Sequence, residues 1–157
     1  MGTTANDHEK FMALALVEAE KAGKRGDLPI GAVIVHNGKV ISKGSNRKHT
    51  KQSLVAHAEI DAIHSCAPYL KEQNNECVIY TTLEPCIMCL STIITANITT
   101  VYFALEDRYM RIPDYIESTP YIKERLIHYQ GGILRKQSEK YLQKYAPNIA
   151  EMVLKAP

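Results

Sequence analysis

The chain has 157 residues, a formal net charge of +2, 45% apolar residues and 23% charged residues. This length suits one domain with its own core, and the composition is typical of a globular protein rather than a disordered or fibrous one. The net charge is lower than a strong electrostatic binder of nucleic acid would carry, although it does not exclude a local basic patch. We expect a single domain over residues 1–157.

Location and redox state follow from apolar runs and cysteine spacing. No apolar run approaches the roughly 18 to 20 residues of a membrane-spanning helix, and residues 1–10 are polar rather than signal-like. Cys86 and Cys89 have the spacing of a metal-binding pair, whereas Cys66 and Cys77 are expected to be core thiols. We therefore expect reduced thiols, no membrane association and a cytoplasmic location.

Hydrophobic periodicity predicts an alternation of helices and strands. A first helix is expected to be capped by Asn6 or Asp7 and ended by Gly23 and Gly26. Short apolar runs predict strands, and an Asn-Gly pair predicts a hairpin turn after the first of them. The expected strands cover residues 31–36, 39–43, 77–82 and 99–104, and the expected helices cover 56–69 and 86–96.

Two prolines are assigned places in these helices, and the pattern is weaker after residue 105. Pro68 is expected to end helix 56–69, and Pro85 to lie in the first turn of helix 86–96. A strand near 126–129 and a helix over 134–145 are expected beyond them. The alternation predicts an α/β fold, a three-layer α/β/α sandwich with a central mixed sheet of about five strands, an antiparallel first hairpin and parallel pairs joined by crossover helices.

Two motifs open neighbouring helices of this predicted fold. His57 and Glu59 stand at the start of one helix, and Cys86 and Cys89 at the start of the next. Ligands of open α/β sheets bind beside the carboxyl ends of the strands, so both motifs can converge there. Cysteines three residues apart share a helix face, and a helix N-terminus stabilises thiolates. One imidazole with two thiolates suits zinc.

Three protein ligands leave a fourth tetrahedral position for water, as a catalytic zinc site requires. Bound zinc lowers the pKa of water from about 15.7 to roughly 7, and a nearby carboxylate can transfer its proton. We predict one Zn²⁺ per chain, held by His57, Cys86 and Cys89, with Glu59 as the catalytic residue. A fourth cysteine ligand would instead make the site closed and structural.

The motif His-x-Glu followed by Pro-Cys-x-x-Cys is the signature of zinc nucleobase deaminases, and residues 57–59 and 85–89 match it at every specified position. Over most of residues 11–104 the chain resembles the cytidine deaminase superfamily, especially the branch with tRNA-specific adenosine deaminases and guanine deaminases. Further matching strings cover residues 28–33, 56–60 and 81–89. The resemblance implies a cytidine deaminase-like fold, hydrolytic release of ammonia and a homodimer. It also implies that Glu59 takes a proton from water and gives it to a ring nitrogen.

The resemblance further implies substrate contacts from Asn46, Pro29, and the backbone near Ala58 and Glu84. Two alternatives stay open here, because Glu84 can simply support the turn before the metal helix and Asn46 can be a loop residue. A cluster of aromatic and basic residues either lines an opening to the site or is ordinary amphipathic surface. Its members are Arg108, Tyr109, Met110, Arg111, Tyr115 and Tyr121.

Departures from the family patterns bear on the substrate. Enzymes that act on free cytidine generally have cysteine as the first ligand and fungal-type cytosine deaminases have His-Gly-Glu, so His57-Ala58-Glu59 favours a purine. Residues 105–114 and 151–157 lack the small-residue loop and basic helix typical of tRNA-acting members. We predict deamination of free guanine or adenine, of a purine nucleoside, or of adenosine to inosine in tRNA. The alternatives are a cytosine or cytidine deaminase, and a non-catalytic zinc protein that acts as a nucleic-acid-binding or scaffolding subunit.

Overall fold

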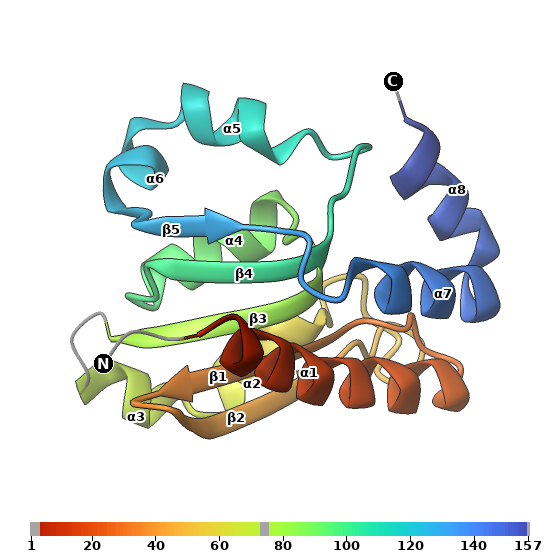
Figure 1. Ribbon diagram of the computed structural model, residues 1–157, viewed down its shortest axis with the longest axis horizontal. Coiled ribbons are helices and arrows are strands. Elements are labelled where there is room, and N and C mark those ends of the chain that lie inside the picture. The colour runs from red at the N-terminus through yellow and green to blue at the C-terminus, as the bar shows by residue number, and fades with distance from the viewer. Residues whose placement is uncertain (1–3, 73–75, 157) are drawn as a thin grey trace.

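A five-stranded mixed sheet forms the centre of the computed structural model, which describes residues 4–72 and 76–156 (Figure 1). The strands are β1 Gly31–His36, β2 Lys39–Ser45, β3 Cys77–Leu83, β4 Thr100–Leu105 and β5 His128–Gln130. Their order is β2-β1-β3-β4-β5, with β1 antiparallel to β2 and β3, and with β3, β4 and β5 mutually parallel. The predicted mixed sheet is confirmed.

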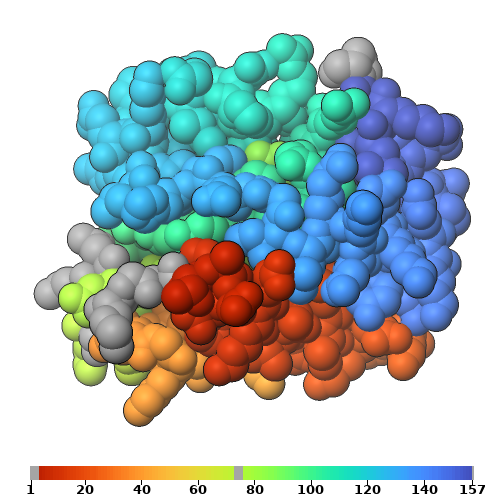
Figure 2. Space-filling view, viewed as in Figure 1, coloured from red at the N-terminus to blue at the C-terminus, as the bar shows by residue number. Residues whose placement is uncertain are grey.

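Helices cover both faces of this sheet. They are α1 Ala5–Arg25, α2 Ala58–Ser65, α3 Ala67–Glu72, α4 Ile87–Thr95, α5 Ile112–Ser118, α6 Pro120–Arg125, α7 Arg135–Tyr145 and α8 Pro147–Lys155. Alternate residues of β1 point to opposite faces: Val33 and Val35 pack in the cluster of α1, whereas Ala32 and Ile34 pack with α2 and α4. On the first face α1 and α7 lie side by side (Figure 2). The three-layer α/β/α prediction is therefore confirmed.

The first helix begins two or three residues earlier than predicted. Thr4 is its N-cap: the Thr4 hydroxyl accepts from the Asp7 backbone N–H at 3.2 Å, and the Asp7 carboxylate accepts from the Thr4 N–H. The predicted cap at Asn6 or Asp7 is wrong, because Asp7 is the third helical residue of this capping box. The helix continues through Gly23 and ends at Gly26, whose φ of 94° suits a left-handed C-cap.

The two metal-motif helices also differ from their predicted bounds. The expected helix 56–69 is interrupted at Cys66, where φ is −125°, and divides into α2 and α3. Pro68 therefore lies in the first turn of α3, where a missing N–H costs little, rather than at a helix end. Helix α4 begins at Ile87 with Cys86 as its N-cap, so Pro85 precedes the helix instead of lying in its first turn.

The C-terminal third contains both confirmed and unpredicted elements. Strand β5 lies near the expected 126–129, and α7 matches the expected helix 134–145, whereas α5, α6 and α8 were not predicted. Helix α8 packs on α7 and buries Ala150 and Val153 against Leu83, Leu105 and Leu142. None of the described helices combines the length and apolar character needed to cross a membrane.

Candidate active site

Helix α2 brings His57 close to the sheet. A Cβ atom at Gly44 of β2 would overlap the backbone of Ala58 and Ala62, so glycine allows α2 to pack directly on β2. His57 is the N-cap of α2, and its Nε2 lies 3.1 Å from the carbonyl oxygen of Leu54. A proton on Nε2 that is donated to Leu54 leaves Nδ1 free to bind a metal.

Helix α4 places two sulfur atoms beside that nitrogen. The Sγ atoms of Cys86 and Cys89 lie 3.6 Å and 3.4 Å from Nδ1 of His57, and all three potential ligand atoms lie within 4.8 Å of one another. A tetrahedral zinc ion with Zn–N of about 2.0–2.1 Å and Zn–S of about 2.3 Å would separate nitrogen from sulfur by about 3.5 Å. The three residues therefore fit zinc in both spacing and ligand type.

The cluster is electrostatically suited to a cation. A hydrogen bond with Cys89 lowers the pKa of Cys86 to about 4; burial opposes this, and His57 and the Cys89 backbone N–H add to the lowering. The same hydrogen bond raises the pKa of Cys89, so negative charge is favoured on the Cys86 sulfur rather than on that of Cys89. Cys66 and Cys77 are buried elsewhere, and the cluster found among the described residues contains only His57, Cys86 and Cys89. This set leaves one tetrahedral position for water.

Glu59 is a buried carboxylate beside the cluster. Its side chain is 3% exposed, and its Oε1 accepts from the Thr81 hydroxyl at 2.6 Å. Burial raises the pKa of Glu59, and hydrogen bonds with Cys89 and Thr81 partly oppose that rise. A carboxyl group whose charged form is disfavoured by burial holds a proton more readily than an exposed one, as a group that accepts and then donates a proton requires.

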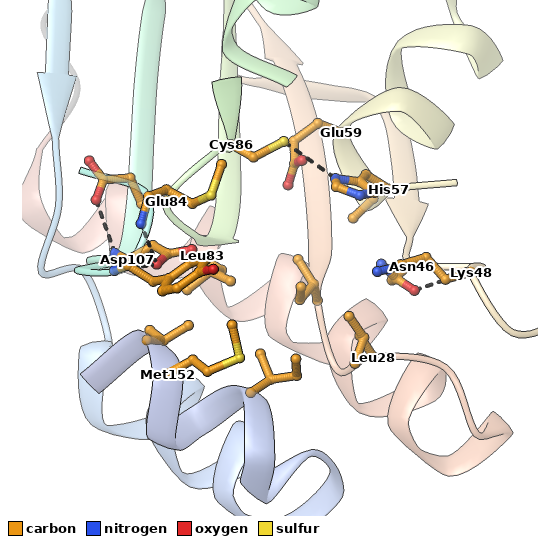
Figure 3. A pocket seen from close by; sticks show the side chains of 16 residues that line it. Leu28, Asn46, Lys48, His57, Glu59, Leu83, Glu84, Cys86, Asp107 and Met152 are labelled. Carbon is orange, nitrogen blue, oxygen red and sulfur yellow. Dashed lines mark hydrogen bonds between the residues drawn. The ribbon is translucent and has the colours of Figure 1, made fainter. Parts of the chain in front are cut away.

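His57, Glu59 and Cys86 line a cavity of about 300 Å³ (Figure 3). Of the predicted substrate contacts, Asn46, Ala58 and Glu84 line it; Pro29 does not, although its neighbours Leu28 and Ile30 do. The complete lining is Leu28, Ile30, Asn46, Lys48, His57, Ala58, Glu59, Leu83, Glu84, Cys86, Asp107, Tyr109, Met110, Ile149, Met152 and Val153.

Asn46 and Glu84 occupy different sides of the cavity. Oδ1 of Asn46 accepts from the backbone N–H of Lys48 at 3.0 Å, and Figure 3 shows its amide nitrogen directed toward the cavity. Both oxygens of Glu84 are engaged, because Oε1 accepts from the Asp107 backbone N–H at 3.0 Å and Oε2 from the Tyr129 hydroxyl at 2.5 Å. Glu84 thus joins the end of β3 to the segment after β4 and to β5. These contacts support the alternative in which Glu84 stabilises the chain next to the metal helix.

Several lining residues were not predicted from the sequence. Asp107 follows β4 at the sheet edge where the motifs meet, and that position could have identified it. No local pattern pointed to Ile149, Met152 or Val153 of α8. Of the aromatic and basic cluster, Tyr109 and Met110 line the cavity. Arg108 and Arg111 line a neighbouring depression instead.

The fold and the cluster together define the class to which the protein belongs. Proteins of this class have an α/β fold with a metal site of one histidine and two cysteines at the strand ends, beside a buried glutamate. The chain belongs to the family described as the cytidine and deoxycytidylate deaminase zinc-binding region, whose model matches residues 5–105. The suspected superfamily and its zinc cofactor are confirmed.

Two named relatives indicate which branch of the family this chain is similar to. The chain is 44% identical to the tRNA-specific adenosine deaminase of Agrobacterium fabrum over 98 residues, which are 62% of this chain and 64% of the relative. It is 39% identical to the guanine deaminase of Bacillus subtilis over 104 residues, 64% of this chain and 65% of the relative. The chain thus spans just under two thirds of the length of each.

Solved structures agree with the fold. One, from a study of A-to-I editing by tRNA deaminases at the wobble position, is 37% identical with a TM-score of 0.69 and covers 78% of this chain and 97% of its own. The guanine deaminase of Nitrosomonas europaea has a TM-score of 0.73, covers 87% of this chain and 83% of its own, and is 21% identical. The second likeness supports the fold alone.

Proposed function

We propose that the protein is a zinc-dependent hydrolytic deaminase that replaces an amino group on a nucleobase ring with oxygen and releases ammonia. The observation that carries this proposal is the convergence of His57, Cys86 and Cys89 beside a cavity that His57, Cys86 and Glu59 line. A purine substrate is supported by relatives that are named tRNA-specific adenosine deaminase and guanine deaminase.

The residues of the chain have distinct parts in this reaction. His57, Cys86 and Cys89 would hold zinc, which when bound supplies a water with a pKa near neutrality. Glu59 accepts a proton from that water and delivers it to the ring nitrogen beside the carbon that carries the amino group. The carbon gains the oxygen, and Glu59 then takes the remaining proton from that oxygen and gives it to the amino group. The carbon–nitrogen bond breaks, ammonia leaves and the oxygen stays as the ring carbonyl. The donor group of Asn46 orients the base, and Thr81 keeps the Glu59 carboxylate in place.

Two other functions compete with this one. A cytosine or cytidine deaminase would use the same residues, so only the substrate distinguishes it. A non-catalytic zinc protein is opposed by Glu59, because a buried carboxylate costs desolvation free energy and has no use beside a purely structural zinc.

The proposal is tested by measuring zinc content and ammonia release together. Wild type is incubated with guanine, adenine, adenosine, guanosine, cytosine, cytidine and an anticodon stem-loop RNA. We expect one zinc per chain and ammonia from a purine substrate, with both lost in Cys86→Ser and both retained in Cys77→Ser, a matched control outside the cluster. Zinc-loaded protein that releases no ammonia from any of these compounds would favour the non-catalytic alternative. Ammonia from cytosine compounds alone would contradict the purine assignment.

We also propose a homodimer and a cytoplasmic location. Exposed apolar side chains lie close to the metal cluster in sequence: Leu54 is 81% exposed, Val55 56% and Ile87 43%. Light scattering should give twice the chain mass, and Ile87→Asp should lower it. The thiols of the metal cluster remain reduced most readily in the cytosol, so cell fractionation should find the protein there.

A further inference from the structure

Two opposite sides of the cavity present unused hydrogen-bonding atoms. Oδ1 of Asp107 accepts from the backbone N–H groups of Tyr109 and Met110 at 2.9 and 3.2 Å, and no hydrogen bond from the described residues reaches Oδ2. Figure 3 shows Asp107 across the cavity from Asn46, whose amide nitrogen is also unpaired within the described part of the chain. The cavity thus presents an acceptor on one side and a donor on the other.

Much of the remaining lining is apolar and comes partly from α8. Ile149, Met152 and Val153 line the cavity, and the side chain of Met152 points into it (Figure 3). The backbone N–H of Arg108 donates to the carbonyl of Val153 at 3.1 Å, which joins α8 to the segment that carries Asp107. A small apolar cavity with a few convergent polar groups suits an aromatic ring.

The surroundings offer little to hold a phosphate backbone. Lys48 is the one lysine or arginine among the described residues that line the cavity. Outside it, Arg108 and Arg111 line the neighbouring depression; Arg111 pairs with Asp114 at 2.5 Å, which leaves Arg108 as the exposed arginine there, and on α8 Lys155 pairs with Glu151 at 3.4 Å. Binding of RNA depends on free cationic side chains placed along the phosphates. The site therefore favours a ligand without phosphates.

We propose that the cavity binds a free purine base whose imidazole N–H is donated to Oδ2 of Asp107, while Asn46 donates to an acceptor of the base. This inference rests on the proposed deaminase function and narrows its substrate class. The amino groups of purines lie on the six-membered ring, so when that ring faces Glu59 the imidazole ring is directed away from Glu59. Only the free base carries an imidazole N–H, because a sugar replaces it at N9 in nucleosides and RNA. Asp107 is therefore a specificity-determining residue.

The test compares guanine and adenine with their 9-methyl derivatives, their nucleosides and an anticodon stem-loop RNA. For wild type we expect kcat/KM for the better free base to exceed that of its 9-methyl derivative by about 10- to 100-fold, the range of a hydrogen bond to a charged group. Asp107→Asn keeps an oxygen for the two backbone N–H groups. In this variant the ratio of kcat/KM for the free base to kcat/KM for its 9-methyl derivative should fall close to one. Glu106→Gln, which removes an exposed carboxylate paired with Arg135, should keep it.

A binding measurement separates this inference from the proposed function. Calorimetry with Glu59→Gln should rank the free base above its 9-methyl derivative, and the double variant with Asp107→Asn should bind the two alike. That ranking, together with a zinc-loaded wild type that releases no ammonia from any of the compounds, would refute the deaminase function and uphold the base-binding site. Equal use or binding of free base and nucleoside, efficient use of the RNA, or an unchanged ratio in Asp107→Asn would overturn the inference while deamination stands.

Discussion

Substitution of Asp27 by Asn should destabilise the fold and loosen the loop that carries Asn46. Asp27 is 4% exposed and follows the C-cap of α1. Its Oδ1 accepts from the backbone N–H groups of His49 and Thr50 at 2.9 and 2.8 Å, and its Oδ2 accepts from the Thr50 hydroxyl at 2.6 Å and from Arg25 at 2.7 Å. An asparagine keeps one acceptor oxygen, and its NH₂ group then faces the Arg25 guanidinium.

The magnitude follows from the pKa of this carboxyl. Burial alone would raise the pKa of Asp27, but hydrogen bonds from Thr50 and Arg25 lower it from 3.8 to about 2. Each pH unit between the unfolded and folded pKa values is worth about 1.4 kcal/mol, so the charged form stabilises the fold by about 2 kcal/mol. Because the folded pKa is the lower one, this stabilisation is complete above about pH 4 and is lost as the pH falls through about 2.

Urea unfolding of wild type and Asp27→Asn measures this effect. At pH 7 the variant should have a free energy of unfolding about 2 kcal/mol lower, and the difference should shrink as the pH is lowered from 4 toward 2. The control is Asp114→Asn, whose carboxylate is 65% exposed in its ion pair with Arg111 and should change stability by less than about 0.5 kcal/mol. An Asp27→Asn variant as stable as wild type at pH 7, or a pH-independent difference, would refute this reasoning.

Three further results are expected. Gly44→Ala should lower both the melting temperature and the zinc content, because its Cβ displaces the backbone of Ala58; wild-type values of both would contradict the close packing of α2 on β2. Thr81→Val should lower kcat about 10-fold with zinc retained, because Glu59 loses its hydroxyl donor, and an unchanged kcat would deny Thr81 that positioning role. Removal of zinc by a chelator should lower the melting temperature, and addition of zinc should restore the original melting temperature, because the metal binds only the folded chain. Equal melting temperatures with and without zinc would contradict this expectation.

The strands and the metal cluster were predictable because their signals are local. The apolar run before Asn37 and Gly38 predicted the hairpin, and both residues adopt the positive φ angles that its turn requires, 51° and 75°. The two short motifs that contain His57, Cys86 and Cys89 were predicted to meet because ligands of open α/β sheets bind at the carboxyl ends of the strands. The α1 cap was misplaced because Thr4, Asn6 and Asp7 are all capping residue types, and the local hydrogen bonds between Thr4 and Asp7 select Thr4.

The cavity wall was not predictable because packing between distant segments decides it. Met152 and Asp107 are 45 positions apart, and they share a cavity only because α8 folds back on α7. Helix α8 is short and follows α7 after Ala146 alone, so its apolar face has no partner that can be identified from sequence. The single-domain organisation, the homodimer and the roles of individual site residues stay predictions.

The most direct test of the central claim is ammonia release by zinc-loaded Glu59→Gln beside zinc-loaded wild type. The substitution keeps the size of the side chain and an oxygen that can accept from the Thr81 hydroxyl, and it removes the capacity to carry a proton. We predict one zinc per chain in both proteins, together with loss of nearly all turnover in the variant. Wild-type turnover in Glu59→Gln would contradict the proposed mechanism.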